Sequence, residues 1–219
     1  MLRAAASLCL ALACAAAQAA DGAAQFRAGD YAGARATFEA QLSANPQDAQ
    51  AEYYLGRIAL NGEQATAALA HLRSAAQLAP GNAEYQRWLG EALVKYVDEV
   101  NVFRKPTVAR QLRDAFARAV ELDPDMLDAR EALMEFYLRA PSFIGGGIDK
   151  AKLQAQEIAR RDAARGHKAG GDLAAAEDRF DAATREYQLA LQINPNYPQA
   201  RAALAKLAER SPSKKRTHI

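Results

Sequence analysis

The stretch EQATAALAHLRSAAQLAP, residues 63–80, decides the fold of this chain. A second stretch, GDYAGARATFEAQLSANP at residues 29–46, lies 34 residues earlier and has the same order of small, large and closing residues. Both have apolar residues at helical spacing and end in a proline, which cannot continue a helix. Glycine recurs with the same period, at Gly22, Gly56 and Gly90. The chain is therefore built from an internal repeat.

Each repeat is predicted to contain two helices joined by a turn. In the second repeat, AEYYLGRIAL is the first helix, NGE the turn and ATAALAHLRSAAQLAP the second helix. Helix axes that approach to about 8–10 Å leave room only for a small side chain at the crossing. We therefore expect Gly56 and Ala68 to mark the crossing. Larger residues of the second helices are expected to fill the space around the crossings: Phe38, Leu72, Phe116 and Tyr187.

This pattern resembles the tetratricopeptide repeat (TPR) family, whose helix–turn–helix units of the same length stack into a right-handed superhelix. The residues that match it are Gly29, Tyr31, Ala34, Phe38 and Pro46; Gly56, Ala68, Leu72, Ala75 and Pro80; Trp88, Gly90, Phe116, Ala119 and Pro124; and Gly171, Phe180, Ala183, Tyr187, Ala190 and Pro195. The resemblance implies an all-α fold, a right-handed α-solenoid with repeats at residues 20–46, 47–80, 81–124, 125–163 and 164–195. A capping helix at 196–210 and a basic tail at 211–219 would follow.

Two repeats depart from the pattern. In the third, Leu112 replaces the small residue; in the fourth, Met134 replaces the glycine and Ala163 stands where a closing proline is expected. Pro80 and Pro124 are 44 residues apart rather than 34. The surplus, around residues 95–106, predicts an insertion loop between the two helices of the third repeat. The fourth repeat has a smaller surplus at the same place.

The smaller surplus lies in APSFIGGGIDKA, residues 140–151, whose three consecutive glycines raise the question of a phosphate cradle. A phosphate loop needs the spacing G-x-x-x-x-G-K-[ST], but Ile148, Asp149 and Lys150 follow the glycines. A dinucleotide site is not favoured either, because the preceding run EALMEFYLRA has helical spacing. We predict that the glycines end the insertion and turn the chain, with positive φ, into a helix that begins near Ile148.

The N-terminal segment is typical of a secretory signal peptide. Residues 1–19 place an Arg before an apolar run and then a small-x-small site, Ala17-Gln18-Ala19. This predicts a mature chain that begins at Ala20 and a periplasmic protein. The alternative is lipidation at Cys14, which would make an outer-membrane lipoprotein. Cys9 and Cys14 are the only cysteines, so the rest of the chain has no thiol.

The composition does not favour nucleic-acid binding or catalysis. The chain has 28 Lys and Arg against 26 Asp and Glu, a balance that indicates no nucleic-acid partner. Its histidines, His71, His167 and His218, show no metal-binding spacing, and no serine has a G-x-S-x-G context. His71 is expected to be a partly exposed surface residue. We expect no catalytic, metal-binding or cofactor-binding residues, and an enzyme of unknown type is only the third hypothesis.

The repeats favour binding, since the first helices of such an array line one continuous concave surface. The resemblance implies six groove-facing residues: Tyr53, Arg57, Arg87, Glu91, Glu131 and Glu135. The carboxylate clamp of the chaperone-docking subfamily is not supported, because Tyr53 and Arg57 stand where that clamp begins with Lys and Asn. The expected partner is a protein or peptide, and the expected function is that of an exported interaction module or adaptor.

The insertions carry apolar residues that need a reason to be in loops. These are Val100, Val102 and Phe103 in the first and Phe143 and Ile144 in the second. One interpretation is a small satellite core, and the other is an exposed patch for a partner. The alternative function is a membrane-anchored component of envelope assembly, and membrane contact is expected only if Cys14 is lipidated.

Overall fold

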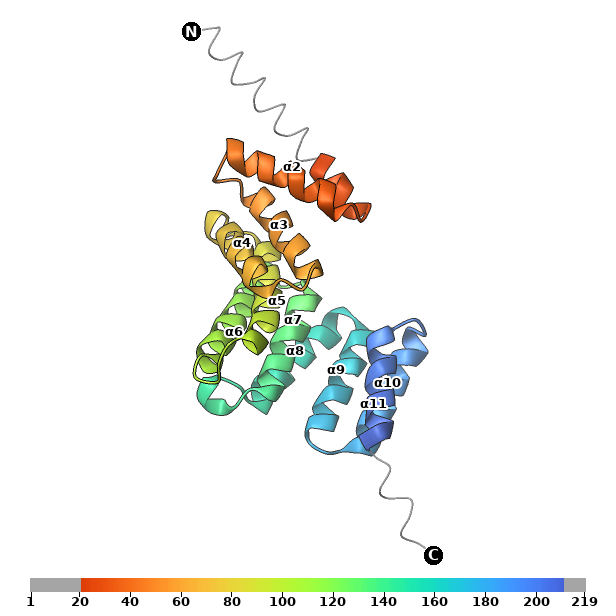
Figure 1. Ribbon diagram of the computed structural model, residues 1–219. Coiled ribbons are helices and arrows are strands. Elements are labelled where there is room, and N and C mark those ends of the chain that lie inside the picture. Colours follow the sequence, from red (N-terminus) through yellow and green to blue (C-terminus); the bar gives the residue numbers. More distant parts are fainter. Residues whose placement is uncertain (1–20, 211–219) are drawn as a thin grey trace, which may run out of the picture. The chain divides into compact units, whose positions relative to one another are not determined.

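The computed structural model describes residues 21–210, and all regular structure in that range is helical (Figure 1). After a helical segment at residues 21–27, the elements are α2 (Tyr31–Ala44), α3 (Ala49–Asn61), α4 (Ala65–Leu78), α5 (Ala83–Glu99), α6 (Lys105–Leu122), α7 (Leu127–Arg139), the 3₁₀ turn η1 (Ser142–Ile144), α8 (Ile148–Arg161), α9 (Ala163–Ala176), α10 (Phe180–Ile193) and α11 (Pro198–Arg210). The predicted all-α class is confirmed. The predicted signal peptide, Cys14 and the basic tail lie outside the described residues. None of the described helices combines the length and apolar character needed to cross a bilayer.

The contacts divide the described residues into two units, with the division between Asp123 and Pro124. In the first unit each helix from α2 to α6 packs on the next, and α3 also contacts α5. In the second unit each helix from α7 to α11 packs on the next, and α9 contacts both α7 and α11. The segment 21–27 and helices α3, α5, α7, α9 and α11 are called A helices below, and α2, α4, α6, α8 and α10 are called B helices. Successive A helices therefore form a common face within each unit.

Local sequence sets where several helices begin. Asp48 accepts hydrogen bonds from the backbone N–H groups of Gln50 and Ala51, both at 3.0 Å, and so caps α3. Asn82 caps α5 through the N–H of Tyr85 at 3.2 Å. Short polar side chains at this position satisfy N–H groups that have no partner inside the helix.

Inside the repeats, a glycine of the A helix faces a large side chain of the B helix. A Cβ added at Gly56 would overlap Leu72, and one added at Gly171 would overlap the ring of Tyr187. Gly90 faces Phe116 in the same way. The large partners are buried, which confirms that they fill the space at the crossings.

The fourth repeat reverses these sizes. Met134 occupies the glycine position, is 1% exposed, and packs in one cluster with Ala151 and Ala155 of α8. The small residues of the B helix thus make room for the large residue of the A helix. Because the closing proline is missing, α8 and α9 are joined by Asp162 alone, which ends α8 and accepts a hydrogen bond from the N–H of Arg165 in α9 at 2.9 Å.

The predicted ten-residue insertion loop of the third repeat was wrong. Helix α5 continues to Glu99 and α6 begins at Lys105, so that only residues 100–104 form a loop. The surplus lengthens these helices to 17 and 18 residues, against 13 and 14 in the second repeat. The reason at the α5 end is that Tyr96 and Val97, both half-buried, continue the apolar spacing of that helix into the surplus.

The three glycines have the role predicted for them. Gly145 and Gly147 have φ values of 102° and 146°, and α8 begins at Ile148. Gly146 passes so close to the Ala140 carbonyl that a Cβ would overlap it. The N–H groups of the three glycines donate within the turn, to the carbonyls of Ser142, Pro141 and Tyr137. These N–H groups are therefore already used, unlike those of a phosphate cradle.

Candidate functional site

The A-helix face of the first unit is centred on Arg57 of α3. Its guanidinium carbon lies 4.3 Å from the ring centre of Trp88 and 4.6 Å from that of Phe26, with the Tyr53 ring at 5.4 Å. Nη1 donates a hydrogen bond to the Tyr53 hydroxyl at 2.9 Å. A guanidinium over aromatic faces is held by cation–π attraction, worth about 0.5–2 kcal/mol for each ring depending on exposure.

Glu84 of α5 joins this group from the next repeat. Its carboxylate accepts hydrogen bonds from Trp88 Nε1 at 2.7 Å, from the Tyr53 hydroxyl at 3.2 Å, and from Arg87 Nε and Nη2 at 3.0 and 2.9 Å. We call the set of Phe26, Tyr53, Arg57, Glu84, Arg87 and Trp88 the Arg57 cluster. It connects the A helices of the first three repeats.

The pKa values of the cluster agree with these contacts. Burial acts to raise the pKa of Glu84, but the hydrogen bonds from Arg87, Trp88 and Tyr53 outweigh it and hold that pKa below its ordinary value. Burial, assisted by the Glu84 charge and opposed by Arg57, raises the pKa of Tyr53 to about 12. At neutral pH the cluster therefore contains a charged carboxylate, charged guanidinium groups and a neutral phenol.

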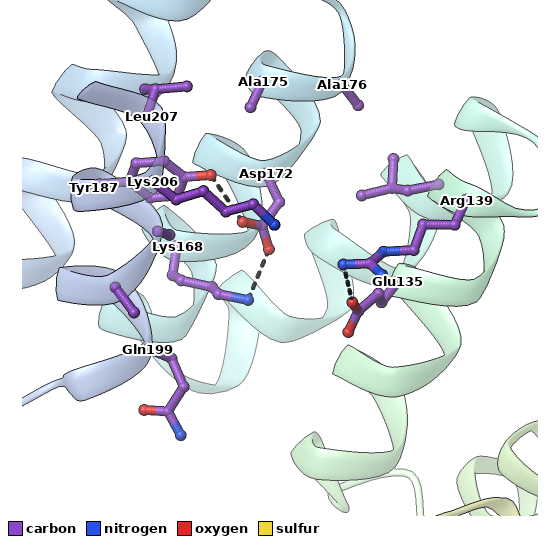
Figure 2. Close-up of a pocket in the computed structure, with 13 residues that line it drawn as sticks. Glu135, Arg139, Lys168, Asp172, Ala175, Ala176, Tyr187, Gln199, Lys206 and Leu207 are labelled. Carbon is purple, nitrogen blue, oxygen red and sulfur yellow. Dashed lines mark hydrogen bonds and ion pairs between the residues drawn. The ribbon is translucent and has the colours of Figure 1, made fainter. Parts of the chain in front are cut away.

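The A-helix face of the second unit contains a pocket of about 560 Å³ (Figure 2). We call it the α7–α9–α11 groove, because its lining comes mainly from those helices: Glu135, Leu138 and Arg139; Lys168, Asp172, Ala175 and Ala176; and Gln199, Ala202, Ala203, Lys206 and Leu207, with Tyr187 of α10. Four of these residues are alanines, which leave the space between the helices open.

Two ion pairs lie in the groove. Lys168 Nζ is 2.8 Å from Asp172 Oδ2, and the other oxygen of Asp172 accepts a hydrogen bond from the Tyr187 hydroxyl at 2.9 Å. Arg139 pairs with Glu135 at 2.7 Å (Figure 2). Lys206 and Gln199 make no side-chain hydrogen bond or ion pair with any described residue, so both are available to a ligand.

Beside the groove, Glu131 occupies a more buried position on α7. Burial raises the pKa of Glu131, and the charges of Arg165 and Lys168 oppose that effect. Arg165 Nη1 is 3.4 Å from Glu131 Oε1, but it pairs more closely with Asp128, at 2.7 Å. Glu131 therefore stands near a cation without a hydrogen bond to Oε1.

The six predicted groove residues fall into different settings. Tyr53, Arg57 and Arg87 belong to the Arg57 cluster, and Glu135 lines the α7–α9–α11 groove. Glu91 is half-buried on α5, one turn after Arg87. The sequence reasoning missed Glu84 and Trp88 in the first unit and Lys168, Asp172 and Lys206 in the second. The repeat period could have found Glu84 and Trp88, since Tyr53 and Arg87 are one period apart and these residues share that face of α5.

The predicted loop residues are mostly exposed. The exposed fractions are 68% for Val102, 90% for Phe103 and 73% for Phe143, whereas Ile144 is buried at 8%. Val100 is half-buried. Ile144 is thus part of the interior of the second unit, whereas Val102, Phe103 and Phe143 are exposed to solvent.

The histidines of the described range bridge the two helices of a repeat. His71 is partly exposed, as predicted, and its Nδ1 is 2.6 Å from Glu52 of α3. His167 of α9 makes the same contact with Glu186 of α10 at 2.8 Å. The positions are equivalent in the two repeats, with the residue types exchanged. No group of His, Cys, Asp and Glu residues among the described ones is arranged to hold a metal ion.

Comparison with known proteins agrees with this architecture. Residues 25–90 match the family model described as Tetratricopeptide repeat. TTC0263, a thermophilic TPR protein in Thermus thermophilus, is 22% identical with a TM-score of 0.67, over 89% of this chain and 99% of that chain. YrrB, a TPR protein with an unusual peptide-binding site, is 20% identical with a TM-score of 0.62, over 83% of this chain and 87% of that chain. Residues 25–90 therefore carry tetratricopeptide repeats, and the chain as a whole shares its fold with these TPR proteins.

Another protein with a similar fold has been solved with a ligand that is not a peptide. A monomeric mutant of IFIT1 with m7Gppp-AAAA has a TM-score of 0.71 at 16% identity, over 88% of this chain and 45% of that chain. No curated protein sequence matches this chain. At these identities the likeness concerns the fold alone, so the ligand class has to be inferred from this chain's own residues.

Proposed function

We propose that this protein is an exported interaction module that binds a peptide segment of another protein in the α7–α9–α11 groove. The observation that carries the proposal is the groove itself, a pocket of about 560 Å³ across three successive A helices in which Lys206 and Gln199 have no partner among the described residues. Its alanines admit side chains, and its paired charges give it polar edges. Grooves of this kind suit an extended or helical segment.

The chemistry of the groove favours a peptide that carries a carboxylate. Lys168 and Arg139 are paired with Asp172 and Glu135, so that Lys206 is the cation left over. The Gln199 amide is a donor and acceptor suited to a peptide backbone. YrrB, which has a similar fold, is a TPR protein with a peptide-binding site, and this supports the same ligand class.

Two pairs of variants test this function. Ala202→Trp should fill the groove, and Ala205→Trp adds the same bulk on α11 at an exposed position outside the groove lining. Lys206→Ala removes the unpaired cation, and Arg185→Ala removes an exposed cation of α10 outside the groove. Peptides would be selected from a random library on the wild-type chain, and their affinities measured by fluorescence polarisation.

The expected result is that Ala202→Trp abolishes peptide binding and that Lys206→Ala weakens it by roughly tenfold, as for loss of one charge-assisted contact. The two control variants should bind as the wild type does. A library that yields no binder, or binders that tolerate Ala202→Trp, would contradict a peptide groove at this site.

Export is the second part of the proposal, supported by the signal-peptide pattern of residues 1–19. The periplasmic chain would begin at Ala20. Mass spectrometry of the N-terminus, purified from a bacterial envelope fraction, tests it. A start at Cys14 with the added mass of acyl chains would instead support the alternative, an outer-membrane lipoprotein in envelope assembly.

A further inference from the structure

A second cavity lies at the α5–α6 end of the first unit. It measures about 390 Å³ and is lined by residues of α4, α5 and the start of α6: Leu69, Arg73, Tyr96, Arg104, Thr107, Val108 and Gln111. No carboxylate is among these residues. Every polar group of the lining can donate a hydrogen bond: two guanidinium groups, a phenol, a hydroxyl and an amide. The lining therefore has the composition of an anion site.

The two arginines of this cavity are not neutralised by the protein. The side chains of Arg73 and Arg104 make no hydrogen bond or ion pair with any described residue. Asp114 shares a neighbouring hollow with Arg73, but its carboxylate is taken by Arg113, at 2.6 Å. Two unpaired guanidinium groups beside one cavity attract an anion, and phosphate suits their planar donors.

The start of α6 adds to the positive potential. Arg104 is the N-cap residue of α6, no side chain caps the helix, and its first turn has no acidic residue. Lys105 and Pro106 follow at the positions where Asp or Glu is usually favourable. The helix dipole and the nearby cations therefore have the same sign, an arrangement that costs stability unless an anion binds.

Among the described residues of the first unit, the loop next to the cavity exposes the two most solvent-accessible large apolar side chains. Phe103 is 90% exposed and Val102 is 68% exposed. They precede Arg104 and Lys105 directly in the sequence. Apolar and aromatic side chains at a tip, with cations immediately behind them, match the layering of a bilayer surface, where acyl chains lie below phosphates.

We propose that the α5–α6 end of the first unit binds the surface of a bilayer that contains anionic phospholipid. Phe103 and Val102 enter the boundary between headgroups and acyl chains, and Arg73 and Arg104 hold the phosphate of one lipid. The contact needs no membrane-spanning helix and no acyl chain on Cys14. It would place the peptide-binding protein at a membrane without anchoring it permanently, because one apolar tip and a few cations give reversible binding.

The test uses the full chain with Phe103→Trp as a reporter in the loop. Residues 1–19 are apolar and present in every variant, so a reporter at position 103 separates the loop's contact from any contact of that segment. Vesicles of phosphatidylcholine with phosphatidylglycerol should shift the emission of the new tryptophan to shorter wavelength, and vesicles of phosphatidylcholine alone should do so much less. Trp88 contributes the same background throughout.

The reporter chain with Arg73→Gln and Arg104→Gln should need roughly thirtyfold more anionic vesicles for half the shift, because each lost surface cation weakens binding by about fivefold. The matched control is the reporter chain with Arg27→Gln and Arg35→Gln, which removes two exposed cations elsewhere in the first unit and should bind almost as the parent does. A second variant, Val102→Ser with Phe103→Ser, should lose flotation with anionic vesicles relative to the wild type.

Several outcomes would overturn the proposal. An absent shift, an equal shift with neutral vesicles, or equal binding by the Arg73 and Arg104 variant would each do so. Thermal stabilisation by glycerol phosphate that depends on these arginines, without a vesicle-induced shift, would make the cavity a site for a soluble phosphate. Loop-dependent binding of polyglutamate without vesicle binding would assign it to an acidic protein.

Discussion

The two units build their A-helix faces in opposite ways. In the first unit, aromatic rings and Glu84 surround Arg57, and the face is closed by contacts between repeats. In the second unit, the corresponding face contains a pocket with Lys206 unpaired among the described residues. The interiors of three repeats are alike across the two units, since Gly56, Gly90 and Gly171 each face a large side chain, and the fourth repeat reverses the sizes. The repeat pattern thus sets the interior and leaves the face free to differ.

The difference follows from the composition of single helices. Helix α5 presents Tyr85 and Trp88 to the face, and the Tyr85 ring stacks on Tyr53 with centroids 4.8 Å apart. Helix α9, AARGHKAGGDLAAA, has no aromatic residue and is mostly alanine and glycine. Ala175 and Ala176 of α9 line the groove with methyl groups alone, which do not fill the space between the neighbouring helices, so the groove opens beside them.

The largest expected change in stability tests the contact between a glycine and a large side chain inside a repeat, which recurs in both units. Gly171→Ala should lower the free energy of unfolding by about 1–3 kcal/mol, because the new methyl overlaps the buried Tyr187 ring and forces repacking. Gly170→Ala is the matched control, since its Cβ would meet only the flexible end of Glu186, at 3.2 Å. It should be neutral or stabilising by up to about 1 kcal/mol from helix propensity.

Urea unfolding followed by circular dichroism measures both changes, and Gly90→Ala in the first unit should behave as Gly171→Ala does. Equal stability of the Gly170 and Gly171 variants would contradict the close contact of Gly171 with Tyr187, and a Gly90 variant as stable as the wild type would show that the two interiors are not built alike.

The interior was predictable from the sequence, and the faces were predictable only in part, since Tyr53, Arg57 and Glu135 were placed on them but their partners were not. Gly22, Gly56 and Gly90 are one period apart, and each helix crossing depends on local spacing within one repeat. The groove depends on which residues of different repeats meet, and the spacing within one repeat does not give those neighbours. Lys168 and Lys206 therefore escaped notice, although Glu135 was placed at the groove.

The surplus residues of the third repeat show a second limit of prediction from the sequence. Residues 95–99 and 105–106 of the surplus were assigned to the loop, but they belong to α5 and α6, whereas Val100, Val102 and Phe103 lie in the loop as predicted. Counting residues between prolines finds a surplus. Only the periodicity across its edges tells whether the surplus is loop or helix.

A smaller loss of stability is expected from a change in the Arg57 cluster, which closes the A-helix face of the first unit. Glu84→Gln should lower the free energy of unfolding at neutral pH by about 1 kcal/mol, because it weakens charge-assisted hydrogen bonds from Arg87, Trp88 and Tyr53 in a partly exposed position. The lowered pKa of Glu84 gives stability that is present above the ordinary carboxyl value of 4.5 and is lost as the pH falls through the folded-state value.

Denaturant unfolding between pH 3 and pH 7 measures this effect, because this range lies on both sides of the ordinary carboxyl pKa of 4.5. The wild type and the variant should converge at the acidic end. A difference that is the same at both ends would mean that the Glu84 charge does not hold the cluster together.

In the second unit, Glu131 should change the stability with pH in the direction opposite to Glu84. The raised pKa of Glu131 means that its contribution is fully present below the ordinary value of 4.5 and is lost as the pH rises through the folded-state value. Glu131→Gln should therefore gain stability relative to the wild type as the pH rises to neutrality, by less than Glu84→Gln loses. Glu135→Gln is the control, since Glu135 is an exposed residue of the same helix. If Glu131→Gln lost stability at neutral pH, Arg165 would be a stronger partner for Glu131 than its 3.4 Å separation indicates.

The smallest expected effect is a loss of stability at alkaline pH that comes from Tyr53 in the first unit. Because the pKa of Tyr53 is raised to about 12, its neutral form stabilises the fold below the ordinary value of 10.0, and that contribution is lost as the pH rises through about 12. Wild-type stability should therefore fall more steeply than that of Tyr53→Phe between these values. Other tyrosines ionise in both chains, so only the difference between the two curves is informative. Tyr31→Phe, at an exposed ring of the same unit, should follow the wild-type curve. Parallel curves for wild type and Tyr53→Phe would mean that the Tyr53 hydroxyl reaches solvent, and the face of the first unit would then be open as well.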